Sequence, residues 1–167
     1  MYRKIEDFEK AFAGTAEATG KVFAALTDKS LGQAVGEGYR TLGQLAWHLV
    51  TSYAEMMPRT GLTVKSVDDK SLPPAKADAI RAGYAAVTKE LGAAIKANWD
   101  DASLAVMDDM YGEQWPRGLT LSILLNHEIH HRGQMTVLMR QAGLKVPGVM
   151  GPSKEEWSAY GMEAPPY

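Results

Sequence analysis

The 167-residue chain contains no cysteine and no block of like charges. The absence of cysteine excludes disulfide bonds, thiolate zinc sites and a catalytic thiol, so any metal ion must be bound by histidine, aspartate or glutamate. The 18 basic and 20 acidic residues nearly balance, with a formal net charge of −2. Because nucleic-acid-binding proteins usually carry a basic patch, we expect a small-molecule substrate and no nucleic acid.

The chain also lacks a run of uncharged apolar residues long enough to span a bilayer. The basic pair Arg3 and Lys4 is not followed by the apolar segment of a secretory signal. These features favour a cytoplasmic protein with no membrane partner. The length suits one well-formed core, so residues 1–167 are predicted to form a single domain.

Four segments have apolar residues at the three- and four-residue spacing of amphipathic helices, and connections rich in glycine, proline and aspartate separate them. The predicted helices run from about Ile5 to Leu26, from an N-cap at Thr41 to Met57, from about Ala75 to Asn98, and from an N-cap at Thr120 to Gln141 or Ala142. The sequence therefore predicts an all-α fold, built as a four-helix bundle.

Three further segments are expected to lie outside the long helices. The polar stretch Thr60–Leu72 forms a long connection between the second and third helices. Residues 100–118 have no clear period, and within them Ala105–Tyr111 is expected to be a short extended piece or a lid. Gly143 is the expected left-handed terminator of the last helix, and the prolines beyond it predict an irregular C-terminal tail with at most a short helix over Ser153–Tyr160.

The histidines are concentrated in two of the predicted helices. His127, His130 and His131 lie in the fourth helix and His48 lies in the middle of the second. Residues four apart share one side of a helix, so His127 and His131 can direct their imidazoles to one metal ion, whereas His130 points away. A neutral imidazole buried without a partner costs about 1–3 kcal/mol, and a shared ion would remove that cost. We therefore predict a metal site formed by His48, His127 and His131.

Three imidazole ligands describe an open site, because structural zinc sites usually have four protein ligands and catalytic sites have three. Zinc suits this ligand set, but imidazole also binds nickel, iron and copper, so the metal is left open. The alternative is a bundle without metal, in which each histidine is buried and bonds to a carbonyl group.

The segment His127–His131 also satisfies the H-E-x-x-H pattern of zinc peptidases, in which the glutamate is the general base. Such a peptidase needs a further downstream ligand, and the only downstream carboxylates, Glu155, Glu156 and Glu163, lie in the irregular tail. Glu128 is thus a catalytic candidate, with an ion pair to Arg132 or a hydrogen bond from a ligand imidazole as alternatives. We expect Arg132 to brace the bundle through a carboxylate rather than to bind an anionic substrate.

Two segments resemble the signatures of the DinB/YfiT-like family of damage-inducible, metal-binding four-helix proteins. Thr41–Leu49 is similar to the family's second-helix histidine segment, and His127–Gln134, with Gly143–Pro147 and Gly151–Ser153 after it, is similar to its most recognisable signature. The resemblance covers nearly the whole chain. It implies an up-down-down-up bundle with a long crossover between helices two and three, a homodimer, and nickel or zinc bound by His48, His127 and His131.

The resemblance does not imply a single reaction. Some relatives are thiol S-transferases or isomerases that use a low-molecular-weight thiol, whose pKa the metal would lower. In a hydrolase the metal would activate water. We therefore expect a metal-dependent enzyme of the transferase or hydrolase type that acts on a small molecule. The alternative is a non-catalytic, metal-binding stress-response bundle.

Overall fold

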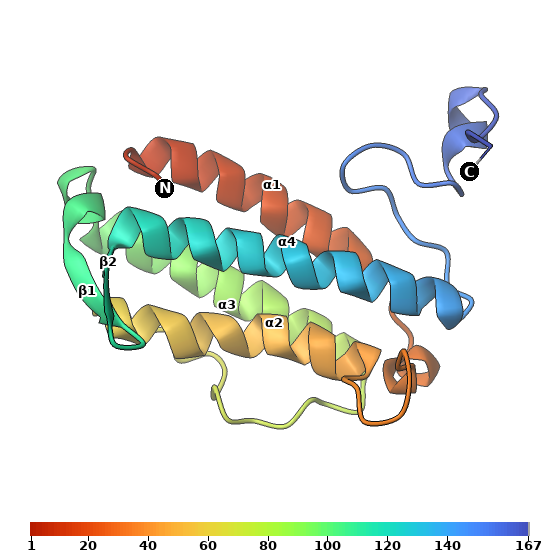
Figure 1. Ribbon diagram of the computed structural model, residues 1–167, viewed down its shortest axis with the longest axis horizontal. Helices are drawn as coiled ribbons and strands as arrows, with labels where there is room; N and C mark the ends of the chain where they lie inside the picture. The colour runs from red at the N-terminus through yellow and green to blue at the C-terminus, as the bar shows by residue number, and fades with distance from the viewer. Residues whose placement is uncertain (167) are drawn as a thin grey trace.

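The computed structural model describes residues 1–166, which form mainly long helices with a small two-stranded sheet (Figure 1). The long elements are α1 (Ile5–Ala24), α2 (Leu42–Met56), α3 (Ala77–Asn98), β1 (Met107–Met110), β2 (Glu113–Pro116) and α4 (Arg117–Gln141). Short 3₁₀-helices lie at Asp28–Gly32, Met57–Thr60, Ala102–Ala105 and Trp157–Tyr160. Within these residues, every helix is too short or too polar to cross a bilayer.

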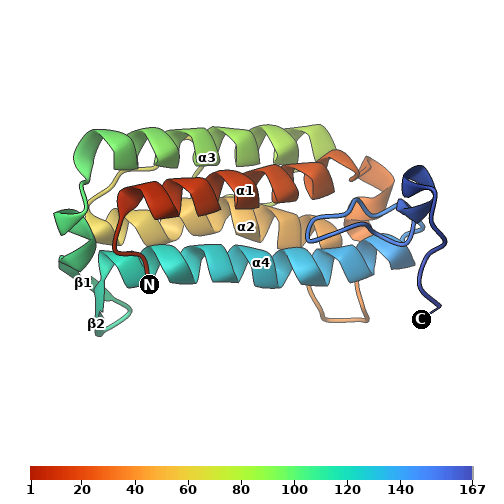
Figure 2. The same ribbon diagram turned by 90° about the horizontal axis from the view of Figure 1, so that it is seen from above.

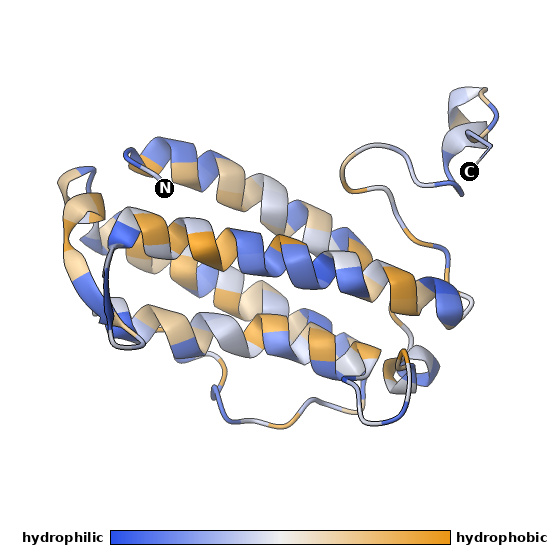
Figure 3. Ribbon diagram, in the orientation of Figure 1, coloured by the Kyte–Doolittle hydropathy of each residue, from blue (hydrophilic) through white to orange (hydrophobic). Residues whose placement is uncertain are grey.

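Each long helix packs against two others around a common core. α1 and α2 both contact α3 and α4, and Figures 1 and 2 show the four helices side by side. The largest fully buried side chains come from all four helices and include Phe8, Phe23, Leu49, Tyr53, Ile80, Leu91, Leu121 and Leu124. Figure 3 shows that α4 is apolar near its start but polar across its middle. Two polar residues of this middle stretch, Glu128 and Arg132, are buried.

Helix α2 begins where the sequence predicts. Thr41 Oγ1 accepts a hydrogen bond from the backbone N–H of Gln44 at 3.2 Å, and Gln44 Oε1 accepts one from the N–H of Thr41 at 2.8 Å. This reciprocal pair is a capping box, which satisfies two N–H groups at the helix start. Farther along, a Cβ at Gly83 of α3 would lie 2.7 Å from the ring of Trp47. The bare backbone at Gly83 thus allows α2 and α3 to approach closely.

Helix α4 begins at Arg117, so the predicted N-cap at Thr120 is wrong. Strand β2 runs directly into the helix, and Pro116 occupies the N-cap position without a side-chain hydrogen bond. Thr120 lies inside the first turns, where its hydroxyl is buried and finds no hydrogen-bond partner within residues 1–166. A threonine before an apolar run was a misleading signal here, because a strand rather than a loop leads into the helix. The predicted end is confirmed, since Gly143 follows with φ +76°.

The expected extended piece is one arm of a β-hairpin. Strand β1 pairs antiparallel with β2, and the turn between them is Tyr111–Gly112, with φ of 62° and 87°. Positive φ at both positions is typical of two-residue hairpin turns. The hydroxyl of Tyr111 donates to Glu55 Oε2 at 2.6 Å, and the guanidinium of Arg59 lies 4.4 Å from its ring centre. These contacts attach the hairpin to the C-terminal end of α2.

The remaining boundaries differ little from prediction. Helix α1 ends at Ala24, two residues early, and α3 begins at Ala77, two residues late. The connection from α2 to α3 is long, and the tail after α4 is irregular, as expected. Within Ser153–Tyr160 only the 3₁₀-helix at Trp157–Tyr160 forms.

Candidate metal centre

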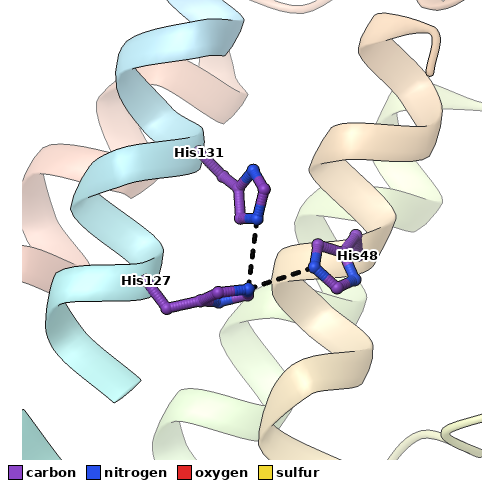
Figure 4. Close-up of side chains that lie close together, drawn as sticks. All are labelled: His48, His127 and His131. Atoms are coloured by element: carbon purple, nitrogen blue, oxygen red, sulfur yellow. Dashed lines mark hydrogen bonds between the residues drawn. The ribbon is translucent and has the colours of Figure 1, made fainter. Parts of the chain in front are cut away.

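The three predicted ligands converge between two helices. His48 of α2 faces His127 and His131 of α4, and their side chains meet in the space between the two ribbons (Figure 4). Nε2 of His127 lies 3.1 Å from Nε2 of His48 and 3.1 Å from Nε2 of His131. One ring nitrogen of each residue lies within 4.8 Å of the other two. The structure thus brings together residues that are 79 positions apart in the chain.

Hydrogen bonds alone do not satisfy this arrangement. A neutral imidazole nitrogen carries either one proton or one in-plane lone pair, so Nε2 of His127 can form only one hydrogen bond. Two ring nitrogens, from His48 and His131, nevertheless lie within hydrogen-bond distance of it. A tetrahedral zinc ion with Zn–N bonds of about 2.0–2.1 Å holds its nitrogen ligands about 3.3 Å apart, close to the spacing found here. The donor set therefore fits a divalent cation.

Gln134, one turn after His131, orients that imidazole. Its Oε1 lies 2.7 Å from Nδ1 of His131, so Nδ1–H donates to the amide and Nε2 keeps its lone pair. The amide nitrogen of Gln134 lies 3.2 Å from Nε2 of His130, which is exposed and outside the cluster, as its helical angle predicts. Nδ1 of His127, in contrast, is buried without a partner among residues 1–166.

The histidine cluster is electrically neutral near pH 7. Partial burial, with smaller contributions from nearby positive groups, lowers the pKa of His48 and of His127 from 6.5 to about 4. Burial also lowers the pKa of His131, although its bond to Gln134 acts in the opposite direction. Among the nearby positive groups, Arg40 contributes to the shift of all three residues. The imidazoles are thus in the unprotonated form that metal binding requires.

Comparison with known proteins identifies the family. The sequence profile of the DinB family matches residues 1–164. The chain belongs to the DinB family. It is 41% identical over 165 residues to the uncharacterized protein YrdA of Bacillus subtilis strain 168, and the match covers 99% of each chain. The resemblance noted in the histidine segments is therefore confirmed.

Solved structures of DinB-like proteins share the fold. The crystal structure of a DinB-like protein from Bacillus cereus ATCC 10987 has a TM-score of 0.85 and 42% identity, covering 89% of this chain and 99% of the other. The DinB-like protein YjoA of Bacillus subtilis has a TM-score of 0.68 at 15% identity, covering 86% and 97%. At that identity the likeness concerns the fold alone.

In this DinB protein Glu128 lies inside the bundle and not at the histidine cluster. Its side chain is 1% exposed, and Oε1 accepts hydrogen bonds from Thr19 at 2.6 Å and from Tyr84 at 2.5 Å, while Oε2 accepts one from Tyr53. Adjacent helical residues point about 100° apart, so His127 and Glu128 face different directions. This position does not fit the candidate role of a catalytic base, nor the expected hydrogen bond from a ligand imidazole.

Arg132 braces the bundle, as predicted, but not through a carboxylate. It is 3% exposed, and its Nη1 donates to the carbonyl of Thr15 at 3.2 Å and to the hydroxyl of Thr19 at 3.1 Å. The Thr19 hydroxyl in turn donates to Glu128. Arg132 and Glu128 are therefore joined through α1 and not by the expected direct ion pair.

The hydroxyl partners of Glu128 could not be predicted from the sequence. Tyr53, Tyr84 and Thr19 occupy ordinary core positions in three different helices, and nothing in their spacing marks them as polar partners. Gln134 could have been found, because it lies three residues after His131, where helical neighbours meet.

Proposed function

We propose that this DinB protein binds one divalent metal ion through His48, His127 and His131 and uses the remaining coordination positions for chemistry on a small molecule. The observation that carries the proposal is the convergence of three imidazoles, with Nε2 of His127 3.1 Å from Nε2 of His48 and 3.1 Å from Nε2 of His131. Neutral imidazoles and the open, three-ligand set support it. Nickel and zinc are the ions that we expect.

When bound, such an ion would act as a Lewis acid that lowers the pKa of a coordinated thiol or water molecule. The residues of the chain hold the ion and orient its ligands. His48, His127 and His131 supply neutral lone pairs, and Gln134 keeps the Nδ1 proton of His131 in place. The three histidines are only partly buried, which leaves the cluster accessible to a small molecule.

We favour a thiol S-transferase over a hydrolase. The described residues place no free carboxylate beside the cluster, because Glu128 bonds to hydroxyls in the core and Glu55 bonds to Tyr111 and Arg59. In a thiol transferase the nucleophile is the thiolate itself, so the transfer needs no general base from the protein. In the reaction the sulfur bonds to an electrophilic carbon, the leaving group departs with the bonding electrons, and the thiol proton passes to solvent.

The metal site is tested by replacing a ligand and a neighbour that is not one. His127→Ala should lose most of the bound metal measured by elemental analysis after loading and desalting, whereas His130→Ala should keep it, since His130 is exposed and outside the cluster. Undiminished metal in His127→Ala would contradict the site.

The reaction is tested separately with a model electrophile, 1-chloro-2,4-dinitrobenzene, and a panel of low-molecular-weight thiols. The metal-loaded protein should give a thiol-dependent rate above that of the free ion. His127→Ala should lose this rate and His130→Ala should keep it. A loaded protein with no rate above the free ion would favour the non-catalytic, metal-binding bundle instead.

The proposal also includes the architecture that the family resemblance implies. We propose an up-down-down-up order of the helices, with the segment from Met57 to Lys76 as the crossover between α2 and α3. We further propose a homodimer, which the family resemblance also implies. Analytical ultracentrifugation of the full-length protein would show a single species of twice the chain mass.

A further inference from the structure

The loop before α2 lines two depressions that both reach the histidine cluster. Ala34 and Thr41 pair across the base of this loop, and Tyr39 and Arg40 directly precede Thr41. One depression, of about 440 Å³, reaches His131, and the other, of about 530 Å³, reaches His48. Arg40 lines both depressions. A molecule bound at Arg40 would therefore lie next to the proposed metal site.

The depression that reaches His131, which we name the Arg40 cavity, has mainly apolar walls. Leu45 of α2 and Leu138 of α4 are buried and form part of the wall, and Val35 and Val137 line it although they are 62% and 54% exposed. Exposed apolar side chains gathered around a concave surface are typical of a ligand site. A volume of about 440 Å³ lies within the range of small-molecule pockets.

Arg40 is a cation without an anionic partner in residues 1–166. Its side chain is exposed and takes part in none of the ion pairs or hydrogen bonds of that region, whereas Arg59, Arg117 and Arg140 each pair with a carboxylate. The planar guanidinium binds carboxylates through two parallel hydrogen bonds. An unpaired arginine at the edge of an apolar cavity thus matches a ligand with an acidic end and an apolar body.

We propose that the Arg40 cavity binds the substrate, and that this substrate is a small carboxylic acid with a compact apolar body. The carboxylate pairs with Arg40, and the apolar body lies against Leu45, Val137 and Leu138. This orientation directs the molecule toward His131. The inference rests on the proposed function for the reaction, but the pairing with Arg40 does not require a metal ion.

The proposal is tested by binding to the full-length protein after metal removal with a chelator. The probes are 4-phenylbutyrate, its neutral analogue 4-phenylbutanol and its cationic analogue 4-phenylbutylamine, followed by calorimetry and by NMR shifts. The acid should bind about tenfold more tightly than the alcohol, because only the acid forms charge-assisted hydrogen bonds with Arg40. The amine should bind more weakly than the alcohol.

Three variants separate the roles of charge and apolar contact. Arg40→Gln should reduce the affinity for the acid about tenfold, to that for the alcohol. Arg3→Gln should leave it unchanged, since Arg3 is also exposed and forms no ion pair in the described part of the chain. Val137→Gln should lower the affinity for the acid and the affinity for the alcohol equally. All three positions are exposed, and circular dichroism checks that each variant is folded.

Several results would overturn the proposal. One is equal affinity for the acid and the alcohol, and another is an unchanged affinity in Arg40→Gln. If the acid binds only when the metal is present, and with the same affinity in Arg40→Gln, its carboxylate is only a metal ligand. A dimer that dissociates in Val137→Gln, without a change in acid binding, would assign this face to a contact between copies of the chain. None of these results depends on the metal content of His127→Ala, so the two proposals fail separately.

Discussion

The hydroxyl of Tyr84 on α3 donates a 2.5 Å hydrogen bond to the carboxylate of Glu128 on α4. Short O–H···O⁻ bonds of this kind are stronger than bonds between neutral groups. Because Tyr53 and Thr19 donate to the same carboxylate, one side chain of α4 is bonded to each of the other three long helices. The centre of the bundle is therefore held by a polar group as well as by apolar packing.

Glu128→Ala should destabilise the fold by about 3 kcal/mol or more, because it leaves three buried hydroxyl groups without their acceptor. Tyr84→Phe removes one donor and should cost only about 1–2 kcal/mol. Urea unfolding followed by circular dichroism measures both values. If Glu128→Ala loses no more free energy of unfolding than Tyr84→Phe, the three hydrogen bonds contribute little to stability.

Stability should fall at alkaline pH because of the buried tyrosines. Burial, with the charge of Glu128 as a further cause, raises the pKa of Tyr53 and of Tyr84 above 10. The unfolded chain then releases a proton above pH 10 while the folded protein keeps it, so the stabilisation is complete below pH 10 and is lost as pH rises. The expected slope is about 1.4 kcal/mol per pH unit for each tyrosine.

This pH dependence is measured from the free energy of unfolding between pH 8 and pH 11.5. Tyr53→Phe should be less stable than the wild type at pH 8 but should lose stability less steeply above pH 10. Parallel curves for the two proteins would mean that Tyr53 keeps an ordinary pKa in the fold.

Gln134→Leu should weaken metal binding about 10- to 100-fold, because the Nδ1 proton of His131 loses its acceptor. Gln134→Glu keeps an acceptor at the same distance along the side chain and should bind the ion at least as well as the wild type. Competition with a chromogenic chelator gives both affinities. Equal metal affinities in the two variants would show that Gln134 does not contribute to metal binding.

Metal removal should lower the thermal stability of the wild type but not of His48→Ala. An ion at one hundred times its dissociation constant stabilises the folded state by about 2.7 kcal/mol. For a domain of this size that corresponds to about 5–10 °C in Tm. Calorimetry with and without a chelator measures the shift, and an equal shift in His48→Ala would point to an ion bound elsewhere.

The sequence predicted the elements that depend on local chemistry. The N-cap at Thr41, the terminator at Gly143 and the pairing of His127 with His131 each follow from contacts within one helical turn. The convergence of His48 on that pair could also be predicted. Few other residues of the apolar helices could supply polar partners for the three imidazoles.

The sequence did not predict features that depend on tertiary contacts. The start of α4 at Arg117 follows from the hairpin, whose strands have too few residues to show a period. The interior position of Glu128 depends on hydroxyls from three other helices, and a local H-E-x-x-H pattern contains no information about them. The Arg40 cavity likewise forms only when the loop before α2 lies against α4.

The division of the histidines between α2 and α4 would make the proposed metal site a reporter of folding. An isolated α4 would present only His127 and His131, which are one turn apart, whereas His48 joins them when α2 docks. A coloured ion such as Co²⁺ would therefore change its absorption spectrum at the step when the two helices meet. Refolding followed at that wavelength would time the closure of the bundle without any added label.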